Sequence, residues 1–415
     1  MSRSRIRMLI LSVAAMVVIF SAWNRLRTLN ELEIEFYHHS VLPENSHLKR
    51  FSLKKIEGKI IEPYTYLLKS SASSEIHSLQ NSNLPIKKRR DIEPIQLLFV
   101  PDPLQWVKVP KKGTTVEKCD IPCVYGGDTS SFILENTNAL ILHLPDLNGE
   151  HPRKVLEERN LTVSNAYIVG MTLEPTAKYK HQFDRINDYD IEMTFRMTSD
   201  VPAIYQKFWK KERDILMDPI IPWEKRKKAV AFVADNCHTT SHRENLVKML
   251  EKHIPVNSMS TCLPNTLWPK DIPRSNRRLN KVVLMRRYLA NIAGENSFEK
   301  DYVSEKVYDA LIAGTVSIYL GAPNIDSFVP SDTIINVPQN FTEADVVRIV
   351  KELERIFENK KVYEKWTNFK NRPLDDWFSQ RFNFTRDTMK CRLCRRVYAL
   401  TNGYGWDRNR QEIVS

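Results

Sequence analysis

The sequence predicts an α/β protein made of two halves, each with a parallel sheet covered by helices. Short apolar runs, such as IQLLFVP at residues 95–101 and AVAFVADN at residues 229–236, are typical of buried strands. A polar or amphipathic segment follows each run, and this alternation favours parallel strands joined by helices. The charged stretch WEKRKK at residues 223–228 separates the two series. We therefore expect a hinge there, and a ligand-binding cleft at the carboxyl ends of the strands.

The composition limits the class of protein. A chain of 415 residues with 42% hydrophobic content can bury more than one core, which excludes disorder throughout and suggests two or three domains. The formal net charge of +12 favours anionic partners such as phosphates, nucleic acid or membrane surfaces, although it also serves solubility. The basic residues are scattered, so no nucleic-acid partner is expected.

Residues 8–23, MLILSVAAMVVIFSAW, form an uncharged segment near the amino end. The segment is just under the usual minimum of about 17 residues for a membrane span, and its end lacks a clear small-residue cleavage pattern. We therefore expect an uncleaved transmembrane signal anchor. Three arginines precede it and two follow, so the positive-inside rule places residues 1–7 in the cytosol and the rest of the chain in the lumen. A short span suits the membranes of the early secretory pathway.

The rest of the chain divides by composition. Residues 24–94 are polar and irregular, which predicts a lumenal stem, and the basic run at residues 87–90 is interpreted as a solvated linker. The predicted parts that follow are an N-terminal α/β domain at 95–222, a C-terminal α/β domain at 223–375 and a C-terminal segment at 376–415.

Two features are consistent with a lumenal chain. Glycosylation triplets of the form N-x-T begin at Asn160, Asn340 and Asn383, although such triplets also arise by chance. Six cysteines in local clusters fit disulfides in an oxidising compartment. The C-x-x-C at residues 391–394 could also bind zinc, but zinc needs four ligands and no second C-x-x-C or H-x-x-x-H pair exists. The disulfides that we expect, most secure first, are Cys391 with Cys394, then Cys119 with Cys123 or a cross-link among these and Cys237 with Cys262.

A dense polar cluster lies within residues 295–306, directly before an apolar stretch. Asp301 is a plausible N-cap of a helix that runs to about Ala313, with Gly314 as its C′ residue and the strand TVSIYL after it. The cluster therefore enters a helix amino terminus. Its members are Glu295, Asn296, Asp301, Tyr302, Glu305 and Lys306.

This helix start has the chemistry of an anion site. Its free N–H groups and the charge of Lys306 favour a phosphate. Arg243 begins a second helix, directly after the strand at residues 229–236, where a guanidinium can bind a diphosphate with two parallel hydrogen bonds. Glu295 and Glu305 disfavour a bare phosphate but suit a ligand that also offers hydroxyls or a base N–H. A nucleotide sugar has all three groups.

The motifs together resemble the α1,3/α1,4-fucosyltransferases, glycosyltransferase family 10. DYVSEKVYDALIAGTVSIYLGAP at residues 301–323 is similar to the family pattern F-E-N-S/T, Y-V-T-E-K, a helix and a V-P-V/I strand. FVADN with Arg243, YDIEMTFRMTSDVPAIY, CDIPC and CRLC continue the match, which covers about residues 95–394. The sequence departs from the pattern at Gly294, Ser304 and Ser317, where the family has phenylalanine, threonine and proline.

The resemblance implies the GT-B architecture, two Rossmann-like domains facing a cleft. It implies GDP-fucose as donor and an inverting transfer to a GlcNAc hydroxyl of glycoprotein N-glycans in the Golgi, in α1,3 or α1,4 linkage, closest to the plant-type enzymes. Glu174, in MTLEP, would be the catalytic base. The predicted donor-binding residues are Arg243 and Lys306 for the diphosphate, and Glu295, Asn296, Tyr302 and Glu305 for the nucleotide and sugar hydroxyls.

No metal site is expected. Asp188-Tyr-Asp190 is a D-x-D, the motif that chelates a metal in another class of glycosyltransferase, but here it lies in the family's non-metal segment and the fixed cations supply the charge. No cofactor is required for the chemistry, with a divalent cation at most stimulating it. The alternatives are a lumenal glycosyltransferase with another nucleotide sugar and an inactive sugar-binding or scaffolding homologue.

Overall fold

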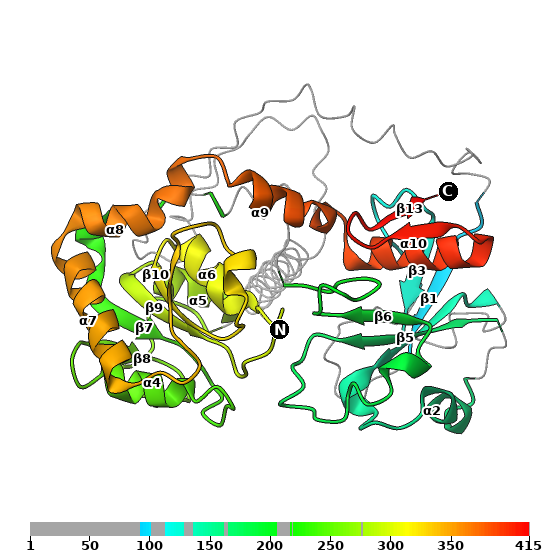
Figure 1. Cartoon of the computed structure of the whole chain (residues 1–415), viewed down its shortest axis with the longest axis horizontal. Helices are drawn as coiled ribbons and strands as arrows, with labels where there is room; N and C mark the ends of the chain where they lie inside the picture. Colours follow the sequence, from blue (N-terminus) through cyan, green and yellow to red (C-terminus); the bar gives the residue numbers. More distant parts are fainter. Residues whose placement is uncertain are drawn as a thin grey trace, which may run out of the picture. The chain divides into compact units, whose positions relative to one another are not determined.

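The structure is a computed structural model that describes residues 92–100, 113–127, 136–161, 165–205, 216–217, 219–274 and 277–414 (Figure 1). The predicted anchor at residues 8–23 and nearly all of the predicted stem lie outside these residues. Within the described part of the chain, no helix combines the length and the apolar character that a bilayer crossing needs.

The first lobe contains a six-stranded sheet in the order β2-β3-β1-β4-β5-β6. All neighbouring strands are parallel except β2, which pairs antiparallel with β3. Strands such as β4, ALILH, are buried on both faces, and the parallel arrangement explains why they are continuously apolar. The strands are β1 Ile95–Phe99, β2 Thr114–Thr115, β3 Cys123–Gly126, β4 Ala139–His143, β5 Tyr167–Thr172 and β6 Ile191–Thr194.

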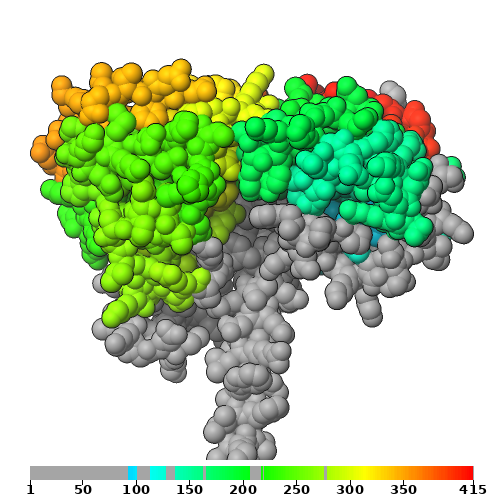
Figure 2. Space-filling model, turned by 90° about the horizontal axis from the view of Figure 1, so that it is seen from below, coloured from blue at the N-terminus to red at the C-terminus, as the bar shows by residue number. Residues whose placement is uncertain are grey.

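Helices cover both faces of this sheet, and one of them comes from the far end of the chain. Val155 and Leu156 of α2 pack against one face, while Leu393 and Val397 of α10 pack against the other. Figure 1 shows α10 in red beside β3 and β1, and in Figure 2 the red atoms adjoin the green and teal atoms of this lobe. The helical elements of the first lobe are η6 Leu144–Asp146, α2 Pro152–Glu158, η7 Ile186–Asp188 and α10 Met389–Asn402.

The second lobe contains a five-stranded, wholly parallel sheet in the order β11-β10-β9-β7-β8. Side chains of β7 alternate between the faces: Val230 and Phe232 enter one apolar cluster, while Ala229 and Ala231 enter another. The strands are β7 Lys227–Phe232, β8 Val256–Ser258, β9 Tyr288–Gly294, β10 Val316–Leu320 and β11 Ile334–Asn336.

Helices α4 and α7 contribute to the first of these clusters, and α5 contributes to the second. Helix α7 is amphipathic and begins with a capping box, in which the side chain of Thr342 accepts from Asp345 N and Asp345 accepts from Thr342 N. The helical elements are η8 Trp223–Lys225, α4 Arg243–Leu250, α5 Arg277–Met285, α6 Glu305–Ala313, η9 Ile325–Ser327, α7 Glu343–Glu358 and α8 Lys360–Thr367.

The remaining elements lead the chain back to the first lobe. They are η10 Asn368–Asn371, α9 Asp376–Arg381, η11 Asn383–Arg386 and, after α10, the antiparallel hairpin of β12 Gly405–Asp407 with β13 Glu412–Val414. The predicted α/β class with two parallel sheets is therefore confirmed. The return of α10 into the core of the first lobe was not predicted.

Two disulfides link α10 to the first lobe. Cys119 is bonded to Cys391 and Cys123 to Cys394, with Cα atoms 5.4 and 6.2 Å apart. The prediction of short local bridges within each of these two clusters is therefore wrong, and the cross-linked alternative is correct. Cys391 and Cys394 of α10 pair with Cys119 and with Cys123, the first residue of β3, because α10 docks on this lobe. Cys237 and Cys262, whose pairing the sequence left open, form a third bridge with each other.

Candidate active site

The site lies where the strand order of the second sheet reverses, between β7 and β9. From β7 the chain crosses to β8 on one side and then returns to β9 on the other, so the segments after β7 and β9 leave the carboxyl ends of neighbouring strands. Such a switch point is where open α/β sheets bind ligands. The segment after β7 leads to Arg243, the first residue of α4, and the segment after β9 leads through Glu295 to α6.

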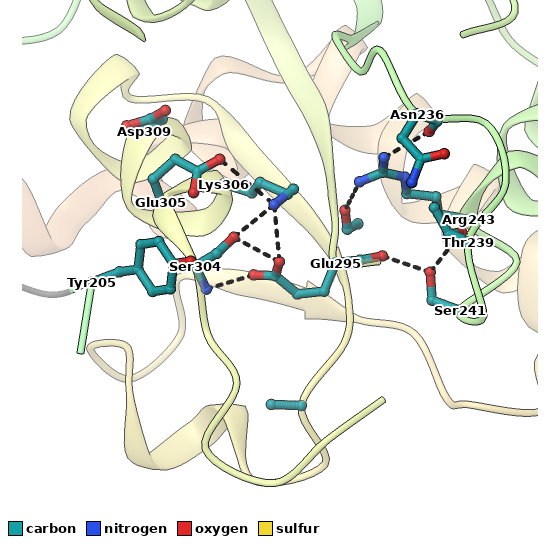
Figure 3. A network of polar contacts seen from close by, with 12 residues as sticks. Tyr205, Asn236, Thr239, Ser241, Arg243, Glu295, Ser304, Glu305, Lys306 and Asp309 are labelled. Carbon is teal, nitrogen blue, oxygen red and sulfur yellow. Dashed lines mark hydrogen bonds and ion pairs between the residues drawn. The ribbon is translucent and has the colours of Figure 1, made fainter. Parts of the chain in front are cut away.

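Glu295 is fully buried and organises the start of α6 (Figure 3). Its carboxylate accepts from Ser304 N at 2.7 Å, from Ser304 Oγ at 2.6 Å and from Lys306 Nζ at 3.2 Å. Lys306 Nζ also donates to Ser304 Oγ at 2.8 Å. The carboxylate of Glu295 is thus occupied by the protein, where its effect is to orient Lys306 at the helix start.

The helix begins later than predicted. Ser304 is the N-cap of α6, while Asp301 lies in the preceding turn with φ +69°, so the predicted Asp301 cap is wrong. Asp301 instead bonds with Asn324, whose amide group contacts both Asp301 N and its carboxylate. Gly314 closes the helix in the left-handed conformation with φ +64°, which confirms the predicted C′ glycine.

The first turn of α6 carries opposite charges that stabilise each other. Glu305 lies 3.6 Å from Lys306 Nζ. Burial alone would raise the pKa of Glu305, but Lys306 and Lys281 outweigh it and lower the pKa to about 2. Burial likewise opposes the charge of Lys306, yet Glu295 and Glu305 raise its pKa above the ordinary value. Both groups are therefore ionised at neutral pH.

Arg243 is buried beside Gly294. Its guanidinium donates to Gly294 O at 2.7 Å and to Asn236 O at 2.8 Å, and its Nε has no partner among the described residues. A Cβ on residue 294 would lie only 2.9 Å from Arg243 Cβ, so the glycine that departs from the family pattern makes the room for this arginine. Burial lowers the pKa of Arg243, while Glu295 and Glu244 oppose that effect.

Arg243 and Lys306 line one small pocket together with Lys281 of α5 and apolar residues of β7 and β9. We call these three residues the cationic pocket. Lys281 was not predicted. Asp309, a buried residue of α6, lies 3.5 Å from Lys281 and 2.9 Å from Arg278, which is on α5 together with Lys281. The signal in the sequence was the spacing of three between Arg278 and Lys281, which places both cations on one helix face.

Asn296 lies next to this pocket in the segment after β9. Its carbonyl accepts from Thr240 N at 3.0 Å and from Ser241 N at 3.3 Å, which joins the two strand-end segments. Ser241 Oγ adds a bond to Glu295 O. The Asn296 side-chain oxygen is buried with no hydrogen-bond partner in the described part of the chain.

Tyr302 connects the α6 entrance to the first lobe. Its ring lies edge-on to those of Phe195 and Tyr205, with centroids 5.3 and 6.5 Å apart. Burial raises the pKa of Tyr205 well above the ordinary value, and the charges of Glu305 and Glu174 raise it further. Glu174 is therefore within electrostatic reach of the same tyrosine as the first turn of α6.

Glu174 follows β5 of the first lobe, in a turn that the protein holds from several sides. Its N–H donates to Thr172 Oγ1 at 3.0 Å, and its carbonyl accepts from the buried Gln182 at 2.9 Å. The Glu174 carboxylate accepts from Lys178 Nζ at 3.1 Å, and its side chain is 21% exposed. It is thus a solvent-accessible carboxylate at the carboxyl end of a parallel strand.

The two aspartates of the D-x-D are bound separately. Asp190 Oδ2 accepts from Ile168 N at 2.7 Å, while Asp188 pairs with Arg185 at 3.2 Å. A cysteine-containing group, Cys119 with Asp120 and Cys391, has metal-ligand spacing, but its two sulfurs form a disulfide. The three predicted glycosylation residues, Asn160, Asn340 and Asn383, are exposed.

Comparison with known proteins finds a family match that includes the second lobe and α10. Residues 223–405 match the model of glycosyltransferase family 10 (fucosyltransferase), C-terminal domain. A fucosyltransferase-like protein of Arabidopsis thaliana is 32% identical over 212 residues, which are 51% of this chain and 38% of that protein. GDP-fucose protein O-fucosyltransferase 3 of Xenopus tropicalis is 28% identical over 191 residues, 42% of this chain and 40% of that protein.

The chain thus spans about two fifths of the length of these curated relatives. A match to alpha-(1,4)-fucosyltransferase of Arabidopsis thaliana is longer, at 25% identity over 293 residues, 68% of this chain and 67% of that protein. Among solved structures, an alpha1,3-fucosyltransferase with GDP covers 75% of this chain and 90% of its own, at 14% identity and a TM-score of 0.46. Residues 223–405 thus match the C-terminal domain of glycosyltransferase family 10, the fucosyltransferase family.

Proposed function

We propose that this chain is an inverting fucosyltransferase that moves L-fucose from GDP-fucose to a GlcNAc hydroxyl of glycoprotein N-glycans, in α1,3 or α1,4 linkage. The observation that carries the proposal is the cationic pocket at the switch point of the second sheet, inside the residues that match the family. Arg243 and Lys306 lie in the first turns of α4 and α6, the helices reached from the neighbouring strands β7 and β9, and both line this pocket.

These charges suit a nucleoside diphosphate. Lys306 is held in place by Glu295 and Ser304, which limits the reorganisation that the lysine must undergo when the diphosphate leaves. Asn296 adds a buried side-chain oxygen without a partner among the described residues, a group that can accept from a sugar hydroxyl or a base N–H. Electrostatic stabilisation of the leaving GDP is then the main contribution of the second lobe.

The transfer itself is a single displacement. The acceptor oxygen forms a bond to the anomeric carbon of fucose, the bond to GDP breaks with its electron pair on the phosphate oxygen, and the anomeric centre inverts. Glu174 takes the proton of the acceptor hydroxyl. Its carboxylate accepts from Lys178 Nζ at 3.1 Å and is open to solvent, so an acceptor hydroxyl can approach it.

The compartment and the cofactor requirement are part of the proposal. We infer a single-pass type II protein of the Golgi membrane, anchored by residues 8–23, with the catalytic lobes and the glycosylated residues Asn160, Asn340 and Asn383 in the lumen. Three disulfides support an oxidising compartment. Arg243 and Lys306 supply the positive charge that a metal supplies elsewhere, so we expect transfer to persist after EDTA treatment.

The test is incubation of the purified chain with GDP-fucose and a panel of N-glycans, followed by mass and linkage analysis of the products. Release of GDP coupled to a fucosylated glycan is the expected result. Parallel reactions with UDP-sugars are the control for donor identity. Absence of transfer to every glycan, or release of UDP in place of GDP, would contradict the proposal.

A second acceptor class follows from one comparison. The match to GDP-fucose protein O-fucosyltransferase 3 of Xenopus tropicalis, over 42% of this chain, favours polypeptide hydroxyls as an alternative to glycan hydroxyls. The same panel therefore includes unglycosylated polypeptides with serine and threonine. Transfer to these alone would assign the protein-acceptor function.

A further inference from the structure

A carboxylate outside the cationic pocket joins the two lobes at the turn that carries Glu174. Thr176 donates twice to Glu299, from its N–H to Oε2 at 2.7 Å and from its hydroxyl to Oε1 at 2.6 Å. Thr176 lies two residues after Glu174, and Glu299 lies four residues after Glu295. Both oxygens of one carboxylate thus bind one residue, and we call this pair the Thr176–Glu299 clamp.

The segment that carries Glu299 is itself held firmly on the side of the second lobe. Asp301, two residues further on, is bonded to Asn324 at 3.0 and 2.9 Å. Ser304 then joins Glu295 and Lys306. A short and fully bonded path therefore runs from the clamp to the cationic pocket.

The same segment touches the first lobe at further points. Asp301 Oδ2 accepts from Met197 N at 3.1 Å, and Tyr302 packs edge-on against Phe195. Arg196, which stacks on Phe183 with 3.5 Å to the ring centroid, lies 4.0 Å from Glu299. Among these contacts between the segment and the described part of the first lobe, the clamp is the one that bonds the turn of Glu174 directly, so its loss would remove that direct link while the other contacts stay.

We propose that Glu299 is a positioning residue that sets where the Glu174 carboxylate stands relative to the cationic pocket. The proposal rests on the fucosyl transfer proposed above, because it assigns Glu299 a part in that reaction. Two hydrogen bonds to one carboxylate fix direction as well as distance, which a single contact does not. Since a displacement of about 1 Å between reacting groups can cost about a hundredfold in rate, the clamp acts on kcat.

The experiment compares Thr176→Val, Glu299→Gln and the double variant with wild type, for kcat and for GDP affinity. Valine keeps the shape and the N–H of threonine but loses the hydroxyl donor. We expect Thr176→Val and Glu299→Gln each to lower kcat about tenfold to a hundredfold, and the double variant to fall no further than the lower single variant, because both substitutions act on the same clamp. GDP affinity of Thr176→Val should stay within about twofold of wild type, since the cationic pocket is untouched.

Two controls separate positioning from a purely structural role. Thr176→Ser keeps the hydroxyl and should restore kcat to within about twofold of wild type. Glu158 forms an exposed pair with Lys154 on α2 of the first lobe. Glu158→Gln is therefore the matched Glu-to-Gln control and should leave kcat unchanged. Equal loss in Thr176→Ser and Thr176→Val, or losses that multiply in the double variant, would overturn the proposal.

Hydrogen exchange tests the clamp without any substrate. The peptide that contains Thr176 should exchange faster in Glu299→Ala than in wild type, because Thr176 N loses its acceptor. Unchanged exchange would overturn the clamp whatever the activity. A wild-type chain that neither binds GDP nor transfers fucose would instead refute the proposed function, and the positioning role with it, even if the exchange result held.

Discussion

At the scale of single residues, the proposed reaction assigns the base to Glu174 in the first lobe and donor binding to the cationic pocket in the second, and substitutions can separate the two contributions. Glu174→Gln keeps the shape of the side chain and can still hydrogen-bond an acceptor hydroxyl, but it cannot take a proton. We expect kcat to fall about a hundredfold to ten-thousandfold, with GDP affinity near wild type. Titration of GDP by calorimetry and initial-rate kinetics measure both. A variant that transfers fucose at more than about a third of the wild-type rate would remove Glu174 from the mechanism.

Arg243→Ala and Lys306→Ala test the other lobe. Each removes one charge-assisted contact to the diphosphate, which is worth about 1.5 to 3 kcal/mol, so GDP affinity and transfer should both fall about tenfold to a hundredfold. Lys252→Ala removes an exposed positive charge of the same lobe and serves as the control for net charge. Equal GDP affinity in all four proteins would mean that the nucleotide binds elsewhere.

The contribution of Glu305 to the free energy of unfolding should depend on pH. The pKa of this carboxyl is lowered from 4.5 to about 2, because Lys306 and Lys281 outweigh its burial. A carboxyl whose pKa is lower in the folded than in the unfolded state stabilises the fold at pH values above its unfolded-state pKa. It loses that contribution as the pH falls through the folded-state pKa. The difference in unfolding free energy between wild type and Glu305→Gln should therefore be constant above about pH 5 and shrink between pH 4.5 and about 2. Urea denaturation at a series of pH values measures it, and a difference that grows toward low pH would contradict the assignment.

At the scale of elements, α6 is the part that brings the site together, and its far end depends on a glycine. Gly314 has φ +64°, and a Cβ there would run into the side chain of Ile220. Gly403, which ends α10 with φ +70°, has no atom within 4 Å of the same position. Alanine in the left-handed conformation costs about 1 to 2 kcal/mol at either place, and Gly314→Ala must add the cost of the steric clash.

We therefore expect Gly314→Ala to lower the free energy of unfolding by more than Gly403→Ala does. The difference between the two variants isolates the packing at the end of α6 from the backbone cost that they share. Denaturant unfolding with matched m-values provides the comparison. Equal losses would show that Ile220 moves away at no cost.

At the scale of the whole molecule, the sequence predicted the two parallel sheets and the position of Arg243 as first residue of α4, because periodic burial and the residues next to a strand are local properties. The N-cap at Ser304 was missed because an aspartate is an equally good cap. The partners that Asp301 bonds instead, Asn324 and Met197, come from other segments of the chain. Lys281 was missed because its partner, Asp309, lies on another helix. Contacts between distant segments, such as Thr176 with Glu299, have no signature in local pattern.

The docking of α10 is another such contact, and the last prediction concerns its disulfides. Cys119–Cys391 closes a loop with a sequence separation of 272, which the chain-entropy account values at roughly 5 to 6 kcal/mol. Once it is closed, Cys123–Cys394 closes only the small ring formed by residues 119–123 and 391–394, worth roughly 2 to 3 kcal/mol. The same reasoning applies when the order is reversed, so each bridge supplies most of the constraint when the other is absent.

Removal of either bridge by paired Cys→Ala substitution should thus cost only the smaller amount, while removal of both should cost roughly 7 to 9 kcal/mol, far more than twice the single loss. The Cys237–Cys262 bridge, with a sequence separation of 25, lies wholly in the second lobe and is the control. The stability lost on its removal should simply add to the stability lost with either of the other two bridges. Urea denaturation of the four variants measures the cycle, and non-reducing peptide mapping verifies the pairing first. Additive costs for the two bridges, or peptides that join Cys391 to Cys394, would contradict the picture of a helix returned from the chain end and held in the first lobe by a double cross-link.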